Sequence, residues 1–302
     1  MKFGSGVKGG SLCGMKVTLI GTGLMGEPMA ERLLGARYQV TVFNRTREKA
    51  LPLAEKGATV AASARDAVAA SEVSVLMLRD AGAIRDLLTE NGSWPNLSGK
   101  TIVQMSTIAP GESVALAEAV QQAGGEYLEA PVLGSTPQAR EGKLLVLVGG
   151  SQESFDRWVD FLRAFGPEPV RIGDVGRAAA LKLALNQLIP SLAATFSLSL
   201  GMVRRHGIDV EVFMGILRQS TFFAQSFDRK LPQMLARDFT NTNFPAELML
   251  KDLHLIRAEA AGLGLDAHGL DGVLEIVRKT VDEGHGREDY SALYEVVDPA
   301  RR

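Results

Sequence analysis

The chain contains a short apolar run that ends in three spaced glycines, and this feature constrains the fold more than any other. The apolar run Lys16–Ile20 is predicted to be a strand, and a helical pattern follows the glycines. The segment between them reads Gly21-Thr22-Gly23-Leu24-Met25-Gly26. Its first glycine permits a tight turn, the second lets the backbone approach a pyrophosphate, and the third lets the helix pack on the strand. Because a second strand, Gln39–Phe43, follows at βαβ distance, the segment predicts a dinucleotide-binding turn.

The residues after the second strand narrow the choice of dinucleotide. NAD-binding units usually carry Asp or Glu there, to accept hydrogen bonds from the ribose hydroxyls. This chain instead carries Asn44-Arg45-Thr46. The planar guanidinium of Arg45 suits phosphate oxygens, and Thr46 adds a hydroxyl. The pattern therefore favours NADP(H) over NAD(H), with a solvated loop arginine as the alternative for Arg45.

Composition excludes several classes of function. The 302 residues suffice for two domains, and 46% hydrophobic with 23% charged residues is typical of a soluble globular protein. A net charge of −2 gives no support for a nucleic-acid or membrane partner. Cys13 is the single cysteine, so no intramolecular disulfide can form and a cytoplasmic location is expected. No metal site is expected, because the four histidines show no ligand spacing: His206, His254, His268 and His285.

Strand-like and helical segments alternate through the first half of the chain. Strands are expected at Lys16–Ile20, Gln39–Phe43, 73–78, 101–105, 127–130, 144–148 and 169–172. Helices are expected to start at Ser63, after Pro110 and at Ser151. The alternation predicts an α/β fold with a Rossmann-type, doubly wound and mostly parallel sheet over residues 15–175. Residues 1–14, rich in Gly and Ser, are interpreted as a disordered extension.

From residue 176 to 302 the strand signals disappear, which predicts an all-α domain. The stretch 183–203 contains no charged residue and is predicted to be a long interdomain helix, buried on most sides and kinked by Pro190. It is long enough to span a bilayer, but its many polar residues argue against that. A small helical domain buries such a helix more easily in an oligomer, so a homodimer or homotetramer through this domain is the hypothesis.

Lys182 and Asn186 are the first candidates for chemistry. They lie four residues apart on the predicted helix and share one face, among apolar and small residues. Apolar surroundings lower the pKa of a lysine, which makes it useful as a proton donor near neutral pH. Reduction of a carbonyl needs such a donor at the oxygen. The alternative is a lysine at the first turn of a helix whose amine reaches solvent.

Three further segments carry polar groups at places where ligands bind. The loop 129–136 offers the amide groups of Gly134 and Ser135 and two hydroxyls, which together could hold a carboxylate. Ser106-Thr107 follows a strand, at the edge where open α/β sheets bind ligands. Lys251-Asp252-Leu253-His254 lies in the helical half, where an exposed charge pair and a surface histidine are the alternative.

Four motifs, in this order, resemble the β-hydroxyacid dehydrogenase family, and the resemblance covers residues 15–295. The motifs are the cofactor turn from Gly21 to Ala30, the substrate loop from Glu129 to Ser135, the catalytic helix start from Gly176 to Asn186, and Lys251-Asp252-Leu253. The resemblance implies that Lys182 is the general acid/base and that Asn186 binds substrate. It also implies that Thr107 and Lys251 lie beside the nicotinamide and that Leu78 lines the cofactor cleft.

The segment Asn44-Arg45-Thr46 resembles the NADPH-preferring glyoxylate and succinic-semialdehyde reductase branch. The expected reaction is reduction of a small aldehyde or keto acid, with 3-hydroxy acid oxidation as an alternative. An imine reductase or a non-catalytic dinucleotide-binding protein is a further alternative, although relatives of those kinds tend to lack the lysine. Leu133 departs from the family, because many members carry Ser there to hold the substrate carboxylate. The substrate itself is left open.

Overall fold

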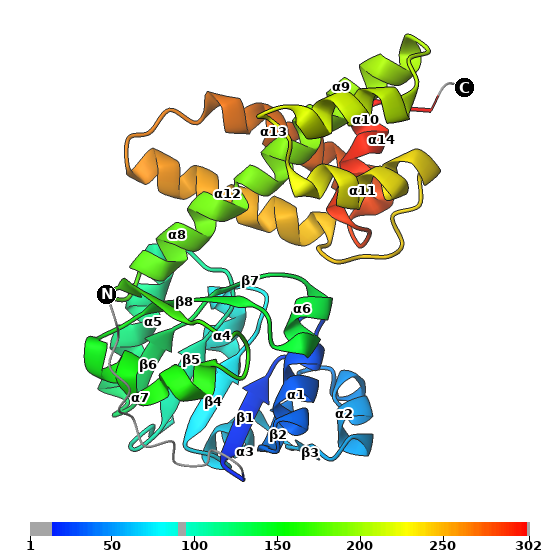
Figure 1. Cartoon of the computed structure of the whole chain (residues 1–302). Helices are drawn as coiled ribbons and strands as arrows, with labels where there is room; N and C mark the ends of the chain where they lie inside the picture. The colour runs from blue at the N-terminus through cyan, green and yellow to red at the C-terminus, as the bar shows by residue number, and fades with distance from the viewer. Residues whose placement is uncertain (1–13, 90–94, 301–302) are drawn as a thin grey trace, which may run out of the picture. The chain divides into compact units, whose positions relative to one another are not determined.

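The computed structural model describes residues 14–89 and 95–300 of the chain, so most of the extension expected at 1–14 lies outside the described residues. The strands are β1 (Lys16–Ile20), β2 (Gln39–Phe43), β3 (Thr59–Val60), β4 (Val73–Leu76), β5 (Thr101–Gln104), β6 (Glu126–Glu129), β7 (Val132–Leu133), β8 (Leu145–Gly149) and β9 (Val170–Gly173). The helices of the first half are α1 (Gly26–Gly35), α2 (Leu51–Glu55), α3 (Ala64–Ala69), α4 (Ala81–Leu88), α5 (Pro110–Gln122), α6 (Thr136–Glu141) and α7 (Gln152–Leu162). Those of the second half are α8 (Arg177–Asn186), α9 (Leu188–Arg205), α10 (Val210–Gln219), α11 (Gln225–Ala236), α12 (Ala246–Gly262), α13 (His268–Thr280) and α14 (Leu293–Val297) (Figure 1).

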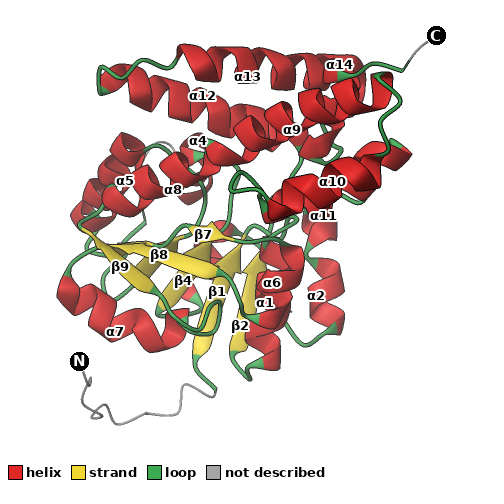
Figure 2. Cartoon of the chain, turned by 45° about the horizontal axis from the view of Figure 1, so that its top comes forward, coloured by secondary structure: helices red, strands yellow, loops and turns green. Residues whose placement is uncertain are grey.

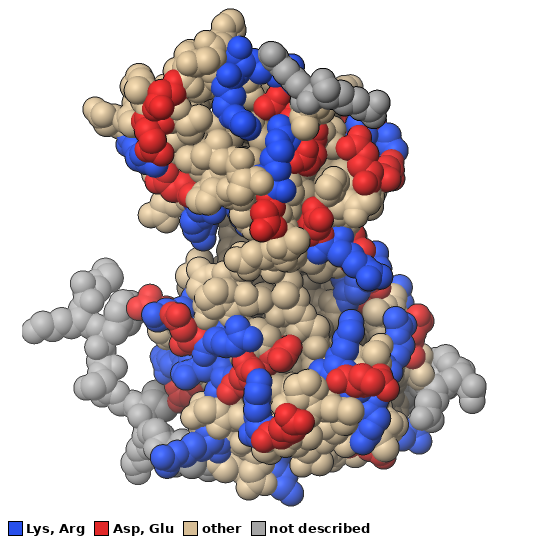
Figure 3. All heavy atoms as spheres, turned by 90° about the vertical axis from the view of Figure 1, so that its right-hand side faces the viewer, with Lys and Arg blue, Asp and Glu red and all other residues tan. Residues whose placement is uncertain are grey.

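The described chain divides into two compact units. The first holds the residues up to Ser106 together with Ser113–Ala178, and the second holds Thr107–Glu112 together with the residues from Ala179 onward. The division therefore lies inside α8, shortly after the boundary at 175 expected from the sequence. On the face that Figure 3 presents, acidic and basic side chains are interspersed over both units. That distribution agrees with the small net charge.

The first unit is built on one sheet with the strand order β3-β2-β1-β4-β5-β6-β8-β7, and β9 pairs with β8. The pairs from β3 to β6 are parallel, whereas β8 runs antiparallel to β6 and β7. The chain moves outward from β1 to β3 and then returns to β4 on the other side of β1. Open α/β sheets bind ligands where the order reverses in this way. The fold thus places the ends of β1 and β4 at a ligand-binding position.

Successive side chains of each strand point to opposite faces of the sheet, and helices cover both faces (Figure 2). Val17 and Leu19 of β1 face a cluster that includes Met29 of α1 and Phe161 of α7, all buried. Thr18 points to the other face, where its hydroxyl donates a hydrogen bond to the carbonyl oxygen of Ala67 in α3, at 2.6 Å. The predicted doubly wound, mostly parallel sheet is confirmed.

The expected helix starts are also present, because their local signals are strong. The hydroxyls of Ser63 and Ser151 accept hydrogen bonds from the amides of Asp66 and Ser154 at the starts of α3 and α7. Helix α5 begins at Pro110. Strands β3 and β7 were not predicted, because they have two residues each and therefore show no alternation.

In the second unit the other helices pack around α9. Ala193 and Ala194 of α9 belong to one apolar cluster with Leu253 of α12 and Val277 of α13. Phe196 and Leu200 belong to another, with residues of α10 and α11. The all-α architecture expected after residue 176 is confirmed. The helical run is interrupted at Gln187, directly after Asn186. Pro190 has no amide hydrogen, so the carbonyl oxygen of Asn186, four residues earlier, lacks its usual helical partner.

The helix is buried or half-buried on its other sides, as predicted, but one side of α9 remains exposed in the single chain. Leu188, Leu192, Leu198 and Met202 keep 36% to 57% of their surface accessible. Among the described residues, the stretch 177–205 has the length and apolar composition of a membrane span, with 44% of the tested window buried. Core helices of soluble proteins satisfy the same criteria, and the apolar clusters on α9 agree with that reading.

Candidate active site

The three glycines of the cofactor turn have distinct steric environments. Gly21 has a φ of +98°, and a Cβ there would lie 2.2 Å from the carbonyl oxygen of Met77. A Cβ on Gly26 would lie 1.8 Å from the carbonyl oxygen of Gly21. A Cβ on Gly23 would meet no described atom within 4 Å. Gly21 and Gly26 are therefore required by packing, whereas the space above Gly23 is open to a ligand.

Asn44 and Thr22 brace the turn against the loop that follows β2. The Asn44 Oδ1 accepts a hydrogen bond from the amide of Thr22 at 3.1 Å, and the Asn44 Nδ2 donates to the carbonyl oxygen of Thr46 at 2.8 Å. The hydroxyl of Thr22 donates to the carbonyl oxygen of Lys49 at 3.0 Å. These contacts hold the glycine turn beside the segment that carries Arg45. Helix α1 begins after Leu24 and Met25, with no side-chain cap among the described residues.

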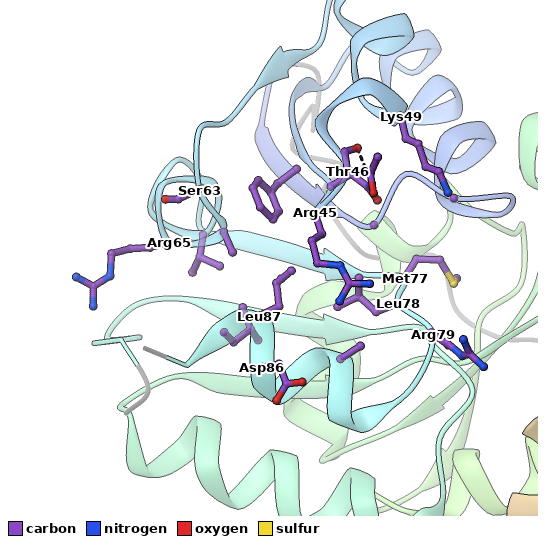
Figure 4. Close-up of a pocket in the computed structure, with 18 of the residues that line it drawn as sticks. Arg45, Thr46, Lys49, Ser63, Arg65, Met77, Leu78, Arg79, Asp86 and Leu87 are labelled. Carbon is purple, nitrogen blue, oxygen red and sulfur yellow. Dashed lines mark hydrogen bonds between the residues drawn. The ribbon is translucent and has the colours of Figure 1, made fainter. Parts of the chain in front are cut away.

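A cavity of about 620 Å³ in the first unit adjoins this turn. Its lining includes Gly21, Gly23, Asn44, Arg45, Thr46, Lys49, Ser63, Arg65, Met77, Leu78, Arg79 and Asp86. Figure 4 shows Arg45 directed into the cavity and Arg65 directed away from it. The volume is within the range of cofactor pockets, and among the described lining residues the cations outnumber the one acidic residue, Asp86.

These residues fit NADP(H). The open space over Gly23 admits the pyrophosphate, and Arg45, Thr46 and Lys49 offer donors to a 2′-phosphate. Leu78 lies against Gly21, because a Cβ built there would be 2.9 Å from the Leu78 Cδ2. The hydroxyl of Ser106 accepts a hydrogen bond from the amide of Leu78 at 2.7 Å and so ties the ends of β4 and β5 together.

Lys182 is buried in the second unit, with 8% of its surface exposed. Burial lowers the pKa of its amine to about 8. The carboxylate of Asp252 raises that pKa and the charge of Lys251 lowers it, both less than burial does. The structure therefore disagrees with the alternative in which the amine reaches solvent.

The neighbours of Lys182 form a polar cluster. The Asn186 Nδ2 donates to the Asp252 Oδ2 at 2.7 Å, and the Lys251 Nζ lies 2.8 Å from the Asp252 Oδ1. The Lys251 Nζ also donates to the carbonyl oxygen of Thr107 at 2.7 Å. The buried Oδ1 of Asn186 accepts no hydrogen bond from the described residues. A substrate hydroxyl or the Lys182 ammonium could donate to this oxygen.

Asp252 was not predicted to be a site residue. The alternative for Lys251-Asp252 was an exposed charge pair, but only 5% of the surface of Asp252 is accessible. The sequence signal that could have identified Asp252 was the presence of a carboxylate within a largely apolar helical segment. His254, two residues later, is exposed as expected for a surface histidine.

The predicted substrate loop contains a local contact between Ser135 and Gln138. The amide and the hydroxyl of Ser135 both donate to the Gln138 Oε1, at 2.7 and 2.5 Å, at the start of α6. The two donors of Ser135 are therefore engaged in a local contact at the start of α6. Gly134 has a φ of +139°, and a Cβ there would lie 2.6 Å from a methyl of Leu144. This glycine is needed for the turn, and its role toward a substrate remains a prediction.

No group of three or more His, Cys, Asp or Glu side chains suited to a metal ion occurs within residues 14–89 and 95–300. The candidate site residues lie mainly in two places, the cavity beside the glycine turn and the cluster around Lys182. A dinucleotide pocket and a buried amine are the parts that a carbonyl reductase requires.

Comparison with known proteins gives matches over nearly the whole chain. Residues 16–173 match the NAD binding domain of 6-phosphogluconate dehydrogenase. Residues 176–297 match the family described as NAD-binding of NADP-dependent 3-hydroxyisobutyrate dehydrogenase.

Individual relatives agree with these matches. The chain is 33% identical to 2-hydroxy-3-oxopropionate reductase of Escherichia coli (strain K12), over 94% of this chain and 97% of the relative. It is 29% identical to glyoxylate/succinic semialdehyde reductase 1 of Arabidopsis thaliana, over 95% and 100%. The structure of 3-hydroxyisobutyrate dehydrogenase from Salmonella typhimurium has the same fold, with a TM-score of 0.82 at 23% identity, covering 93% of this chain and 99% of that chain.

Proposed function

Because this chain belongs to the β-hydroxyacid dehydrogenase family and is an NADP(H)-dependent oxidoreductase, we propose that it reduces a small aldehyde or keto acid to the hydroxy acid. The relatives named for glyoxylate, succinic semialdehyde and 2-hydroxy-3-oxopropionate support this substrate class. The absence of a carboxylate directly after β2, where Arg45 stands instead, supports the phosphorylated cofactor.

Lys182 is the proton donor in this proposal. The reduction adds hydride to the carbonyl carbon and a proton to the carbonyl oxygen, and bound NADPH supplies the hydride. An amine with a pKa of about 8 is largely protonated at neutral pH and releases its proton readily to a nascent alkoxide. The carboxylate of Asp252 favours the charged form before the reaction. The burial of this amine beside the carboxylate of Asp252 is the observation that carries the proposal.

Asn186 orients the substrate in the same proposal. Its Nδ2 is held by Asp252, which fixes the direction of the amide and leaves the buried Oδ1 as an acceptor. Lys251 and Thr107 are joined by a hydrogen bond and are proposed to lie at the nicotinamide end of the bound cofactor. Because Ser135 is engaged with Gln138, we assign carboxylate recognition mainly to the amide of Gly134.

Replacement of the lysine tests this assignment. We expect Lys182→Ala to lower kcat for glyoxylate or succinic semialdehyde by about 10²- to 10⁴-fold, the usual contribution of a general acid. Lys182→Arg is the matched control for charge, since a guanidinium does not release its proton near neutral pH. Both variants should bind NADP⁺ with wild-type affinity by calorimetry. Near-normal turnover by either variant would refute the role of Lys182, and preferential turnover of a cyclic imine would refute the substrate class.

We also propose that the protein is a homodimer or homotetramer through its helical unit. The exposed side of α9 carries Leu188, Leu192, Leu198 and Met202, and α10 adds Val212 and Ile216, which are 57% and 67% exposed. The residues on α9 recur at helical spacing, so they form one apolar stripe along the helix. Contiguous exposed apolar surface of this kind is typical of protein interfaces.

A further inference from the structure

Glu129, at the end of β6, is a fully buried acidic residue outside the cavity and the Lys182 cluster. None of its surface is accessible. Its Oε2 accepts hydrogen bonds from the amides of Gly176 at 2.9 Å and Ala178 at 3.1 Å. These amides belong to the residue before Arg177 and to the first turn of α8, where helical amides lack partners within the helix. A carboxylate is favoured there by charge and by hydrogen bonding.

The surrounding backbone is shaped to hold this carboxylate. Glu129 pairs with Gly149 across the antiparallel contact between β6 and β8. A Cβ on Gly149 would lie 2.1 Å from the Glu129 Oε2, so any side chain there would displace the carboxylate. Gly176, one of the two donors, has a φ of +96°, which favours glycine. Gly149 thus provides the space for the Glu129 side chain, and Gly176 provides a backbone amide that donates to it.

The origin of this cap is unusual. Helix starts are commonly capped by the side chain of the residue just before the helix, as Ser63 and Ser151 do for α3 and α7. The cap of α8 instead comes from a central strand 47 residues earlier. The first turn of α8 is therefore attached to the sheet rather than to its own linker. Lys182 follows Ala178 by four residues, about one helical turn.

We propose that Glu129 is a positioning residue for Lys182, because its carboxylate fixes the first turn of the helix that carries the amine to the end of β6. This inference rests on the proposed role of Lys182 as proton donor. A small displacement of a reacting group lowers the rate strongly, by about 10²-fold for 1 Å. Glu129 acts here through geometry, since the charges that shift the pKa of Lys182 are those of Asp252 and Lys251.

The test compares Glu129→Ala and Glu129→Gln with Tyr127→Phe. Tyr127 lies on the same strand, and its buried hydroxyl is paired with the hydroxyl of Ser113 at 2.8 Å. Tyr127→Phe therefore removes a buried hydrogen bond from β6 and keeps the Glu129 side chain that contacts α8. Glu129→Gln keeps the side-chain length and one acceptor oxygen, and serves if the alanine variant folds poorly.

We expect Glu129→Ala to lower kcat by about 10²-fold and Glu129→Gln to lower it less, with NADP⁺ affinity and the pH midpoint of kcat unchanged. Amide exchange over residues 176–182 should accelerate in both Glu129 variants and not in Tyr127→Phe. Equal kcat in Glu129→Ala and Tyr127→Phe, or unchanged exchange over 176–182, would overturn the inference. An active Lys182→Ala variant would refute the proposed function. Amide exchange does not depend on turnover, so it would still test whether Glu129 attaches α8 to the sheet.

Discussion

At the scale of single residues, the buried amine of Lys182 predicts opposite pH dependences for the two reaction directions. Reduction needs the protonated amine, so its kcat should fall as pH rises through about 8. Oxidation of the hydroxy acid needs the neutral amine, so its kcat should rise through the same range. Asp252→Asn removes the charge that raises this pKa and should move both midpoints to lower pH. Rate profiles from pH 6 to 10 check this, and midpoints that Asp252→Asn leaves in place would contradict it.

A second prediction at the residue scale concerns Arg45 and the preference for NADPH over NADH. Arg45→Asp removes a donor to the 2′-phosphate and adds a repelling charge, so NADPH should bind at least about tenfold more weakly and NADH should gain relative to it. Arg65→Asp is the matched control, because Arg65 lines the same cavity but points away from it (Figure 4). Calorimetric titration with both cofactors gives the comparison. Equal losses of NADPH affinity in Arg45→Asp and Arg65→Asp would show that only the overall charge of the cavity matters.

At the scale of the element, the glycine turn predicts a separation between stability and binding. Gly26→Ala places a Cβ against the carbonyl oxygen of Gly21 and should destabilise the protein by about 1–3 kcal/mol. Gly23→Ala meets open space and should leave Tm unchanged while weakening NADP⁺ binding, because the methyl fills the space for the pyrophosphate. Thermal unfolding without cofactor and NADP⁺ titration test both. Normal NADP⁺ affinity in Gly23→Ala would place the pyrophosphate elsewhere.

At the scale of the whole molecule, the apolar stripe of α9 predicts self-association. The double variant Leu198→Glu, Met202→Glu should shift the mass measured by light scattering toward the monomer, because charges at an apolar interface lose hydration. Leu263→Glu is the control, since Leu263 is 65% exposed and lies outside α9 and α10. A wild-type protein that is monomeric at micromolar concentration would contradict the proposal.

Patterns local in sequence account for what could be predicted. The apolar runs around Val17, Val75 and Ile102 are long enough to show strands, whereas the two residues of β3 or β7 acquire their conformation only by pairing with a neighbour. The Ser63 and Ser151 caps are formed within four residues, so their sequence signals were sufficient. The sequence did not show what covers the exposed side of α9, because hydrophobicity indicates which surface should be covered and does not identify the partner that covers it.

The sequence by itself determined the parts that depend on near neighbours: the glycine turn, the cationic segment after β2, the alternation of strands and helices, and the lysine in an apolar helix. The tertiary structure alone decided which distant groups meet. It buried Asp252 beside Asn186 and placed the Glu129 carboxylate at the start of α8. The physical reason is that the energy of a buried charge or hydrogen bond depends on its surroundings, and folding brings those together from segments far apart in the chain.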